Sequence, residues 1–205
     1  AERDRVLLKP PSAWQAYDHY LRAAVSVAAY HSSYDKASLV AGRQLLAQAL
    51  TIDPNYARAH AALSNVYMSF WIHRWDDEIV WSEALDRSYQ SACEGVRLSP
   101  DLPEAHIALG QALTFLRQHQ AAVAAVERAI TLNRNLTSFR FSYILVLAGE
   151  AARAVELLTS HMRLDPFYQP NAPVALAYAY YMLRRYEEAM PLLLEAAARA
   201  PKMAH

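Results

Sequence analysis

The chain has 205 residues, and its 20 Lys and Arg are balanced by 20 Asp and Glu, so it lacks the excess of positive charge that duplex nucleic acid requires. Hydrophobic residues make up 54% and charged residues 20%, which excludes a disordered chain and is enough to bury a sizeable core. Gly occurs only four times, which is few for a fold of tight hairpins or phosphate-binding loops, so the composition favours helices.

The cellular setting follows from what the sequence lacks. Cys93 is the only cysteine, so there is no internal disulfide and no cysteine metal site, and we expect a reducing, cytoplasmic compartment. No apolar stretch reaches the roughly 18 residues that span a bilayer, so we expect no membrane insertion. The chain begins without Met or a signal peptide and is interpreted as a fragment of a longer protein.

Helix-ending prolines recur along the chain and divide it into repeats. They stand at Pro54, Pro100, Pro166 and Pro201, and Arg134 occupies the equivalent place between the second and third of them. In chain order, the predicted repeats cover residues 12–54, 55–100, 101–134, 135–166 and 167–201. No linker rich in Gly, Ser or Pro divides them, so a single domain over residues 1–205 is the economical interpretation.

Each repeat is predicted to hold two helices. The second helix carries a small residue twelve positions before its stop, at Gly42, Ser88, Ala122, Ala154 and Ala189. The first helix carries an apolar residue, a small residue and a bulky residue at helical spacing, as in Leu63, Ser64 and Tyr67, and again in Leu109, Gly110 and Leu113. These rows resemble the tetratricopeptide repeat, with His60 and His106 replacing its first Trp. The predicted fold is an all-α, right-handed superhelical solenoid of five antiparallel helix pairs.

Longer segments are similar to one particular group of repeat proteins. Residues 1–22 resemble the start of the C-terminal repeat region of bacterial class III adenylate/guanylate cyclases, and so do residues 132–135, 163–167 and 185–189. The resemblance implies a regulatory signalling module that follows a cyclase domain. A winged-helix transcription regulator and a free-standing scaffold are the alternatives. No cyclase catalytic residue falls within the chain, so we expect no enzyme activity, no cofactor and no metal site in this segment.

The concave face of such a solenoid is formed by the first helices of the pairs, and it is the expected binding surface. Residues pointing into it should lie two positions before and after the core residue of each first helix. The predicted groove residues are Asn65, Met68, Ile107, Gln111, Thr114, Phe139, Tyr143, Tyr178 and Tyr181. A wall of amides and aromatic rings suits an extended peptide or a partner helix. The alternative is that the tyrosines pack on one another.

A carboxylate clamp of the chaperone-adaptor type is excluded at the second and third repeats. Asn65 stands where one clamp amide would lie, but Ala61 replaces the basic residue one turn earlier. Glu104 and Ala108 occupy the matching places of the next repeat, where an amide and a cation would be needed.

Three of the four tryptophans fall near the turn of the long second repeat. If this hairpin tip projects, Trp71, Arg74, Trp75 and Trp81 would form a protein or homodimer interface, since Trp and Arg are common in binding hot spots. If it does not project, the rings pack across the hairpin and against the first pair.

Overall fold

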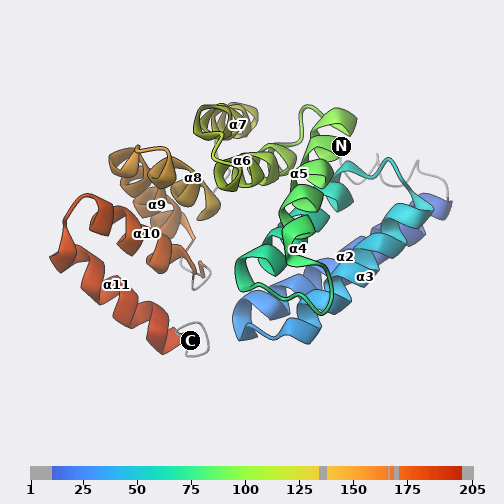
Figure 1. Cartoon of the computed structure of the whole chain (residues 1–205), viewed down its shortest axis with the longest axis horizontal. Coiled ribbons are helices and arrows are strands. Elements are labelled where there is room, and N and C mark those ends of the chain that lie inside the picture. Colours follow the sequence, from blue (N-terminus) through green and yellow to red (C-terminus); the bar gives the residue numbers. More distant parts are fainter. Residues whose placement is uncertain (1–10, 134–137, 166, 169–170, 200–205) are drawn as a thin grey trace.

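The computed structural model describes residues 11–133, 138–165, 167–168 and 171–199, and these residues form ten α-helices and no strand. The predicted all-α solenoid is therefore confirmed. The helices, labelled in Figure 1, are α2 (Pro11–Ser33), α3 (Lys36–Ile52), α4 (Ala57–His73), α5 (Trp81–Leu98), α6 (Pro103–Phe115), α7 (His119–Leu132), α8 (Arg140–Leu147), α9 (Ala151–Leu164), α10 (Asn171–Met182) and α11 (Tyr186–Arg199).

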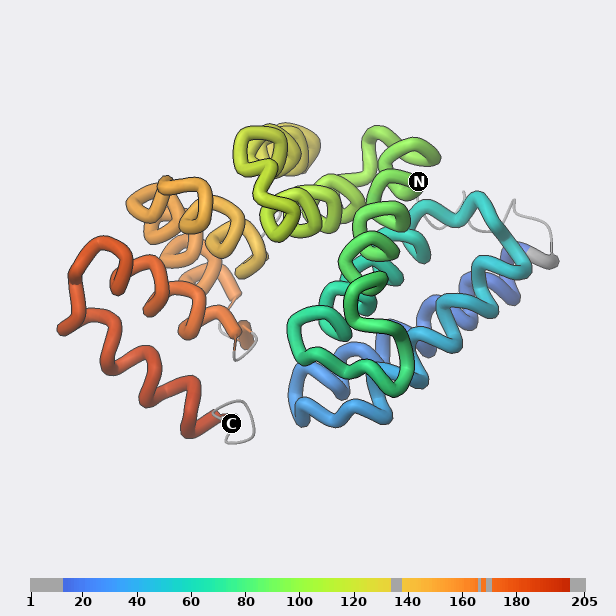
Figure 2. The backbone as a smooth tube through the Cα atoms, in the orientation of Figure 1, coloured from blue at the N-terminus to red at the C-terminus, as the bar shows by residue number. Residues whose placement is uncertain are grey.

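Consecutive helices pack as antiparallel pairs, and the pairs stack in chain order. Each odd-numbered helix packs on the even-numbered helix before it, and α4, α6, α8 and α10 also pack one on the next. The first helices of the pairs therefore form an inner layer. Figure 2 shows that the stack of pairs follows a curved path from α2 to α11.

The second helices end where the recurrent prolines predict. Four of them stop at Ile52, Leu98, Leu132 and Leu164, each two residues before a predicted stop. The next residue in each case, Asp53, Ser99, Asn133 or Asp165, donates its backbone N–H to the carbonyl oxygen four positions earlier. This closes the last turn, and in three of the four a Pro follows that could not continue the helix.

Within each pair, the turn between the two helices holds one residue with positive φ. These residues are Tyr34, Arg74, Arg117, Gly149 and Arg184, with φ between 53° and 89°. A left-handed residue at this point ends the first helix and reverses the chain. Only one of the five is glycine, so four pairs bear the cost of a side chain in this conformation.

Small residues hold the helices of a pair in close contact. A Cβ added at Gly110 would lie 3.2 Å from the carbonyl oxygen of Ala122 on α7. In the preceding pair, the buried Ser88 hydroxyl on α5 donates to the backbone oxygen of Ser64 on α4 at 2.9 Å. Larger side chains at these places would push the paired helices apart.

The two histidines that replace the repeat's first Trp have one structural role. Nε2 of His60 lies 2.9 Å from the carbonyl oxygen of Pro54, and Nε2 of His106 lies 2.9 Å from that of Pro100. Each imidazole therefore fastens the start of a first helix to the turn that precedes it.

The curvature of the solenoid brings its first and last pairs together. The Tyr34 hydroxyl, in the turn between α2 and α3, donates a hydrogen bond to Oδ1 of Asn171, the first residue of α10. These residues are 137 positions apart in the chain. The described structure is thus a nearly closed ring of helix pairs around a central space.

We predict that Gly149→Ala destabilises the protein by about 1 kcal/mol, because an L side chain at positive φ is strained. The added Cβ meets no atom within 4 Å, so this loss reports backbone strain without a clash. Urea unfolding curves should show the shift. The converse substitution, Arg117→Gly at an exposed turn residue with φ of 61°, should leave stability equal or higher. An equal loss of unfolding free energy in both variants would contradict this explanation.

Candidate functional site

Three adjoining hollows run along the inner face of the helix ring. The first, about 400 Å³, follows α2 and includes Tyr20, Ala24 and Val27. The central cavity, about 410 Å³, shares His31, Asn65 and Arg140 with the first hollow. The third, about 280 Å³, follows α10 and shares Tyr143 and Val174 with the central cavity. Neighbouring hollows share lining residues and therefore adjoin one another, and we call the three together the inner channel.

The central cavity has aromatic walls drawn from several helix pairs. The rings that line it are those of Tyr30, Tyr34, Trp71, Phe115, Phe139 and Tyr143. The first two belong to the first pair and its turn, and the last two lie at the start of the fourth pair. The cavity therefore exists only because the ring nearly closes.

Polar atoms in the central cavity lack partners. Oδ1 of Asn65 and Nδ1 of His31 are both buried and make no hydrogen bond with the described residues. A buried polar atom without a partner costs free energy, and such atoms in a cavity are available to a bound group. In contrast, Nε2 of His73 is occupied by the Tyr30 hydroxyl at 2.7 Å.

Arg140, the first residue of α8, brings the only side chain in the cavity lining that is always charged. Its guanidinium lies over the Phe139 ring, 4.9 Å from the ring centroid. None of the residues that line the cavity is Asp or Glu, and Arg140 forms no ion pair with a described carboxylate. Burial lowers the pKa of Arg140 to about 10, which leaves it charged at neutral pH.

The other titratable groups of the cavity are neutral at pH 7. Burial, helped by the positive charge of Arg140, lowers the pKa of His31 to about 4. Burial also lowers the pKa of His73 and raises the pKa of Tyr34 to about 12. The cavity thus combines one cation with neutral aromatic and hydrogen-bonding groups.

Several predicted groove residues line the inner channel. Asn65, Gln111, Phe139 and Tyr143 line the central cavity. Tyr178 and Tyr181 line the third hollow. Asn65, Gln111, Tyr143 and Tyr178 occupy the same place in four successive first helices, two residues after the core residue, so this place faces the channel throughout.

Three of the predicted groove residues do not line the channel. Met68, Ile107 and Thr114 are only 2%, 7% and 3% exposed, and their assignment to the channel wall was wrong. They lie three or four positions from the small residues Ser64 and Gly110, so the helical period turns them toward neighbouring helices. Tyr181, at the corresponding place of α10, is 58% exposed because no described pair packs beyond it.

Sequence reasoning missed much of the central cavity. Tyr30, His31 and Tyr34 come from the end of α2 and its turn, and Asn171 comes from the start of α10. Repeat periodicity shows which face of each helix is buried, but not how far the stack curves. Arg140 could have been found from the sequence, because it is charged where the equivalent positions of the second, third and fifth pairs hold alanine, at Ala62, Ala108 and Ala175.

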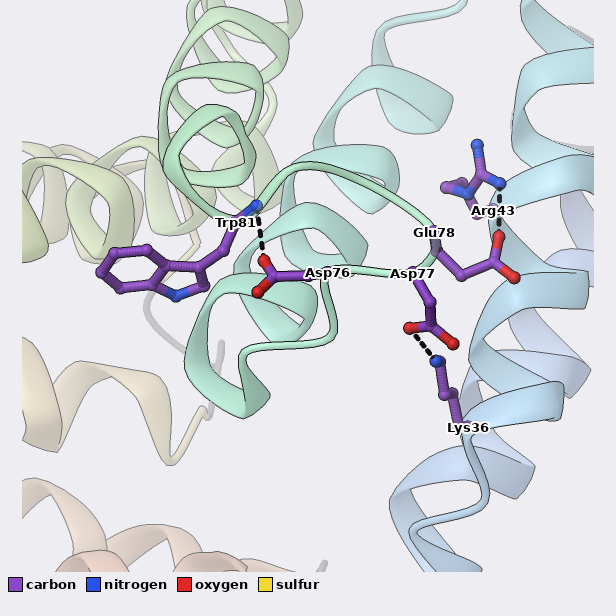
Figure 3. Close-up of polar contacts among 6 residues, drawn as sticks. All are labelled: Lys36, Arg43, Asp76, Asp77, Glu78 and Trp81. Carbon is purple, nitrogen blue, oxygen red and sulfur yellow. Dashed lines mark hydrogen bonds and ion pairs between the residues drawn. The ribbon is translucent and has the colours of Figure 1, made fainter.

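The hairpin tip of the second pair is fastened to the first pair rather than standing free. Figure 3 shows Lys36 and Arg43 of α3 paired with Asp77 and Glu78 of the loop between α4 and α5. The Arg43 to Glu78 distance is 3.1 Å. In the same loop, Asp76 accepts the backbone N–H of Trp81 at 2.9 Å, which satisfies the first free N–H of α5.

The tryptophans of the tip pack within this arrangement. Trp71 stacks on Trp81 with ring centroids 6.0 Å apart, and the Trp81 Nε1–H donates to the Trp71 carbonyl at 2.7 Å. Trp75 stacks on His73 and lies edge-on to Tyr30 of α2. Only Arg74 of the predicted tip residues is exposed, with its guanidinium over the Trp81 ring. A role of the tip as an interface stays a prediction.

Among the described residues we find neither a metal-binding cluster nor a membrane-spanning helix. No group of three His, Cys, Asp or Glu side chains is placed to hold a metal ion in the described ranges. Among the described helices, none is both long and apolar enough to cross a bilayer.

Part of the chain matches a known repeat family, and its fold is similar to those of solved structures. Residues 103–136, which contain α6 and α7, match the tetratricopeptide repeat family. TTC0263, a thermophilic tetratricopeptide protein in Thermus thermophilus, has a similar structure, with a TM-score of 0.67 and 18% identity over 91% of this chain and 92% of that one. A crystal structure of MamA gives a TM-score of 0.51 and 22% identity over 82% of this chain and 92% of that one. No curated protein matches the sequence.

These similarities define the fold. The fold is a tetratricopeptide-like solenoid, and the third helix pair carries the recognised repeat.

We predict that the free energy of unfolding falls as the pH drops from about 7 to 4. An unfolded histidine titrates near 6.5 and folded His31 near 4, so in this window the unfolded chain binds more protons. The loss due to His31 is on the order of 2–3 kcal/mol. Chemical unfolding at several pH values should show a smaller pH slope in His31→Gln than in the wild type. Equal slopes would contradict the assignment.

Proposed function

We propose that this chain is a non-catalytic protein-interaction module that holds an extended segment of a partner along its inner channel. The observation that carries the proposal is that the three hollows adjoin, since neighbouring hollows share lining residues between α2 and α10. A channel of this form accommodates several consecutive residues of a peptide, and the concave faces of solenoids commonly bind in this way.

The chemistry of the channel supports a peptide ligand. Asn65 and Gln111 offer amides to peptide backbone groups, and the buried Oδ1 of Asn65 is free to accept an N–H. Phe139, Tyr143 and Tyr178 supply broad apolar surfaces, while Tyr181 at the end of the channel is exposed. Aromatic side chains bury large areas at small entropic cost, as binding surfaces require.

We assign no catalytic role and no cofactor to the chain. Catalysis would need a nucleophile beside a base, or two carboxylates in a pocket. The inner channel instead presents tyrosines with raised pKa and histidines with lowered pKa beside a single cation, which favours recognition over chemistry.

We predict that Asn65→Ala and Gln111→Ala each weaken peptide binding about tenfold, which corresponds to one lost hydrogen bond. Phage-displayed 12-residue peptides selected on the wild type would provide the ligands, and fluorescence anisotropy would give their affinities. Gln120→Ala, an exposed glutamine on α7, is the matched control and should bind as the wild type does. Failure to select any peptide, or equal losses in all three variants, would contradict the proposed function.

We further propose that the module regulates a nucleotide cyclase domain of the same cytoplasmic signalling protein. The support is the similarity of residues 1–22, 132–135, 163–167 and 185–189 to the repeat regions of bacterial class III cyclases. In a winged-helix regulator, the alternative parent, the same channel would serve as the sensing arm.

We predict that the intact parent protein converts ATP or GTP to a cyclic product, and that deleting residues 1–205 changes the rate. The chain alone should produce none. Quantifying cyclic nucleotide by mass spectrometry separates the cases. A parent without cyclase activity that binds DNA would replace the cyclase assignment by the winged-helix one, and product formed by the isolated chain would contradict the non-catalytic role.

A further inference from the structure

The packing of the first helices does not explain why the inner channel holds a charged side chain at Arg140. The equivalent places in the second, third and fifth pairs are all alanine, and Ala108 and Ala175 are each only 1% exposed. The packing of a first helix therefore needs no long side chain there. In the fourth pair, the same place puts a guanidinium into the central cavity without a described carboxylate partner.

We expect this half-buried guanidinium to lower the stability of the free protein. A charged group removed from water costs free energy unless an opposite charge or hydrogen bonds compensate. The compensation is small, since the Arg140 guanidinium stacks on the Phe139 ring and the residue's hydrogen bond to the Ser138 hydroxyl is donated by its backbone N–H. A residue that destabilises the free protein is commonly retained for function.

We propose that the central cavity is a carboxylate subsite, in which an acidic side chain or the terminal carboxylate of the bound segment pairs with Arg140. This inference rests on the proposed function of the inner channel and adds the class of residue that it selects. The guanidinium offers two parallel N–H groups, which match the two oxygens of a carboxylate.

The neighbours of Arg140 fit a segment that carries this carboxylate. His31 and Asn65 stand with Arg140 at the junction of the first hollow and the central cavity. The unpartnered Oδ1 of Asn65 would repel an anion but accepts a backbone N–H, so it is placed for the peptide group next to the acidic residue. The aromatic rings of the cavity then bury the apolar part of a flanking side chain.

The charge of the cavity favours a carboxylate over a phosphate. A phosphate monoester carries nearly two negative charges at pH 7 and is usually bound by several cations. The cavity lining supplies one arginine, and its two histidines have lowered pKa values and are neutral at that pH. One guanidinium balances one carboxylate.

The subsite differs from a clamp built on adjacent repeats. Residues of the second and third pairs, Ala61 and Ala108, provide no cation for such a clamp. Here the cation comes from the fourth pair and faces Tyr30 and His31 of the first pair, across the ring that Tyr34 and Asn171 close.

Four pools of labelled 11-residue peptides with random flanks test the inference on the immobilised full chain. Three pools carry a C-terminal amide and a central Glu, Gln or phosphoserine, and the fourth carries a central Gln and a free terminal carboxylate. We expect the Glu pool or the free-acid pool to be retained about 30-fold more than the Gln amide pool, as for a buried charge pair. Which of the two is retained identifies the source of the carboxylate.

The variants decide whether Arg140 is responsible. The preference should vanish in Arg140→Met and persist in Arg128→Met, an exposed arginine on α7. In Arg140→Lys, which keeps the charge without the planar pair of donors, it should be reduced but measurable. Because Arg140→Met removes a half-buried charge that has no described carboxylate partner, this variant should also unfold at a higher temperature than the wild type. A lower unfolding temperature together with a carboxylate preference equal to that of the wild type would show that Arg140 is only structural.

The remaining outcomes overturn the inference in distinguishable ways. Equal retention of all pools by the wild type, or an acidic preference that survives Arg140→Met, rejects the carboxylate subsite but leaves the peptide channel standing. A preference for the phosphoserine pool replaces the carboxylate by a phosphate. If no pool is retained, the proposed peptide function itself fails.

Discussion

Close approach of paired helices is the constraint on which the rest of the structure depends. A Cβ at Gly110 would crowd the carbonyl oxygen of Ala122 on α7, and Ser64 and Ser88 meet through their own hydroxyls. Small residues at these places let the helices of a pair approach closely, and the pairs then stack in chain order. The stack curves far enough for Tyr34 of the first pair to reach Asn171 of the fifth. The central cavity therefore depends on the packing of helices many residues away from it.

The second pair shows how an irregular repeat fits a regular stack. Its longer loop could have projected as a free tip. Instead, Asp77 and Glu78 pair with basic residues of α3, and Trp75 packs edge-on against Tyr30 on α2. Partly exposed ion pairs of this kind contribute little stability singly, so we infer that the aromatic packing contributes most of the attachment. Because Tyr30 also lines the central cavity, the tip packs behind a wall of the inner channel.

The sequence was informative where the structure is local and repetitive. The helix stops, the small-residue rows and the channel-facing places of Asn65, Gln111, Tyr143 and Tyr178 all follow from spacing within one repeat. Met68 and Thr114 were misplaced because a face of a first helix that looks free within one repeat is covered by the neighbouring helices. Tyr34 and Asn171 could not be paired at all, since their contact depends on the summed curvature of every pair between them. The periodicity of the sequence therefore predicts the helix pair, but it does not predict how far the stack of pairs curves.

Departures from the internal pattern are the most useful signal in a repeat protein of this kind. At one position of the first helix, three of four pairs hold alanine, which shows that the packing there requires only a small side chain. The charged residue at the same position of the fourth pair is therefore not explained by packing. His60 and His106 illustrate the opposite case, because both serve the same turn contact in successive pairs and so report structure. Arg140 has no such counterpart, and its guanidinium lies in the cavity where partner atoms are missing on Asn65 and His31 as well. Unmatched groups from three different pairs that converge on one space are better explained by a ligand than by the fold, since folding alone would favour their removal.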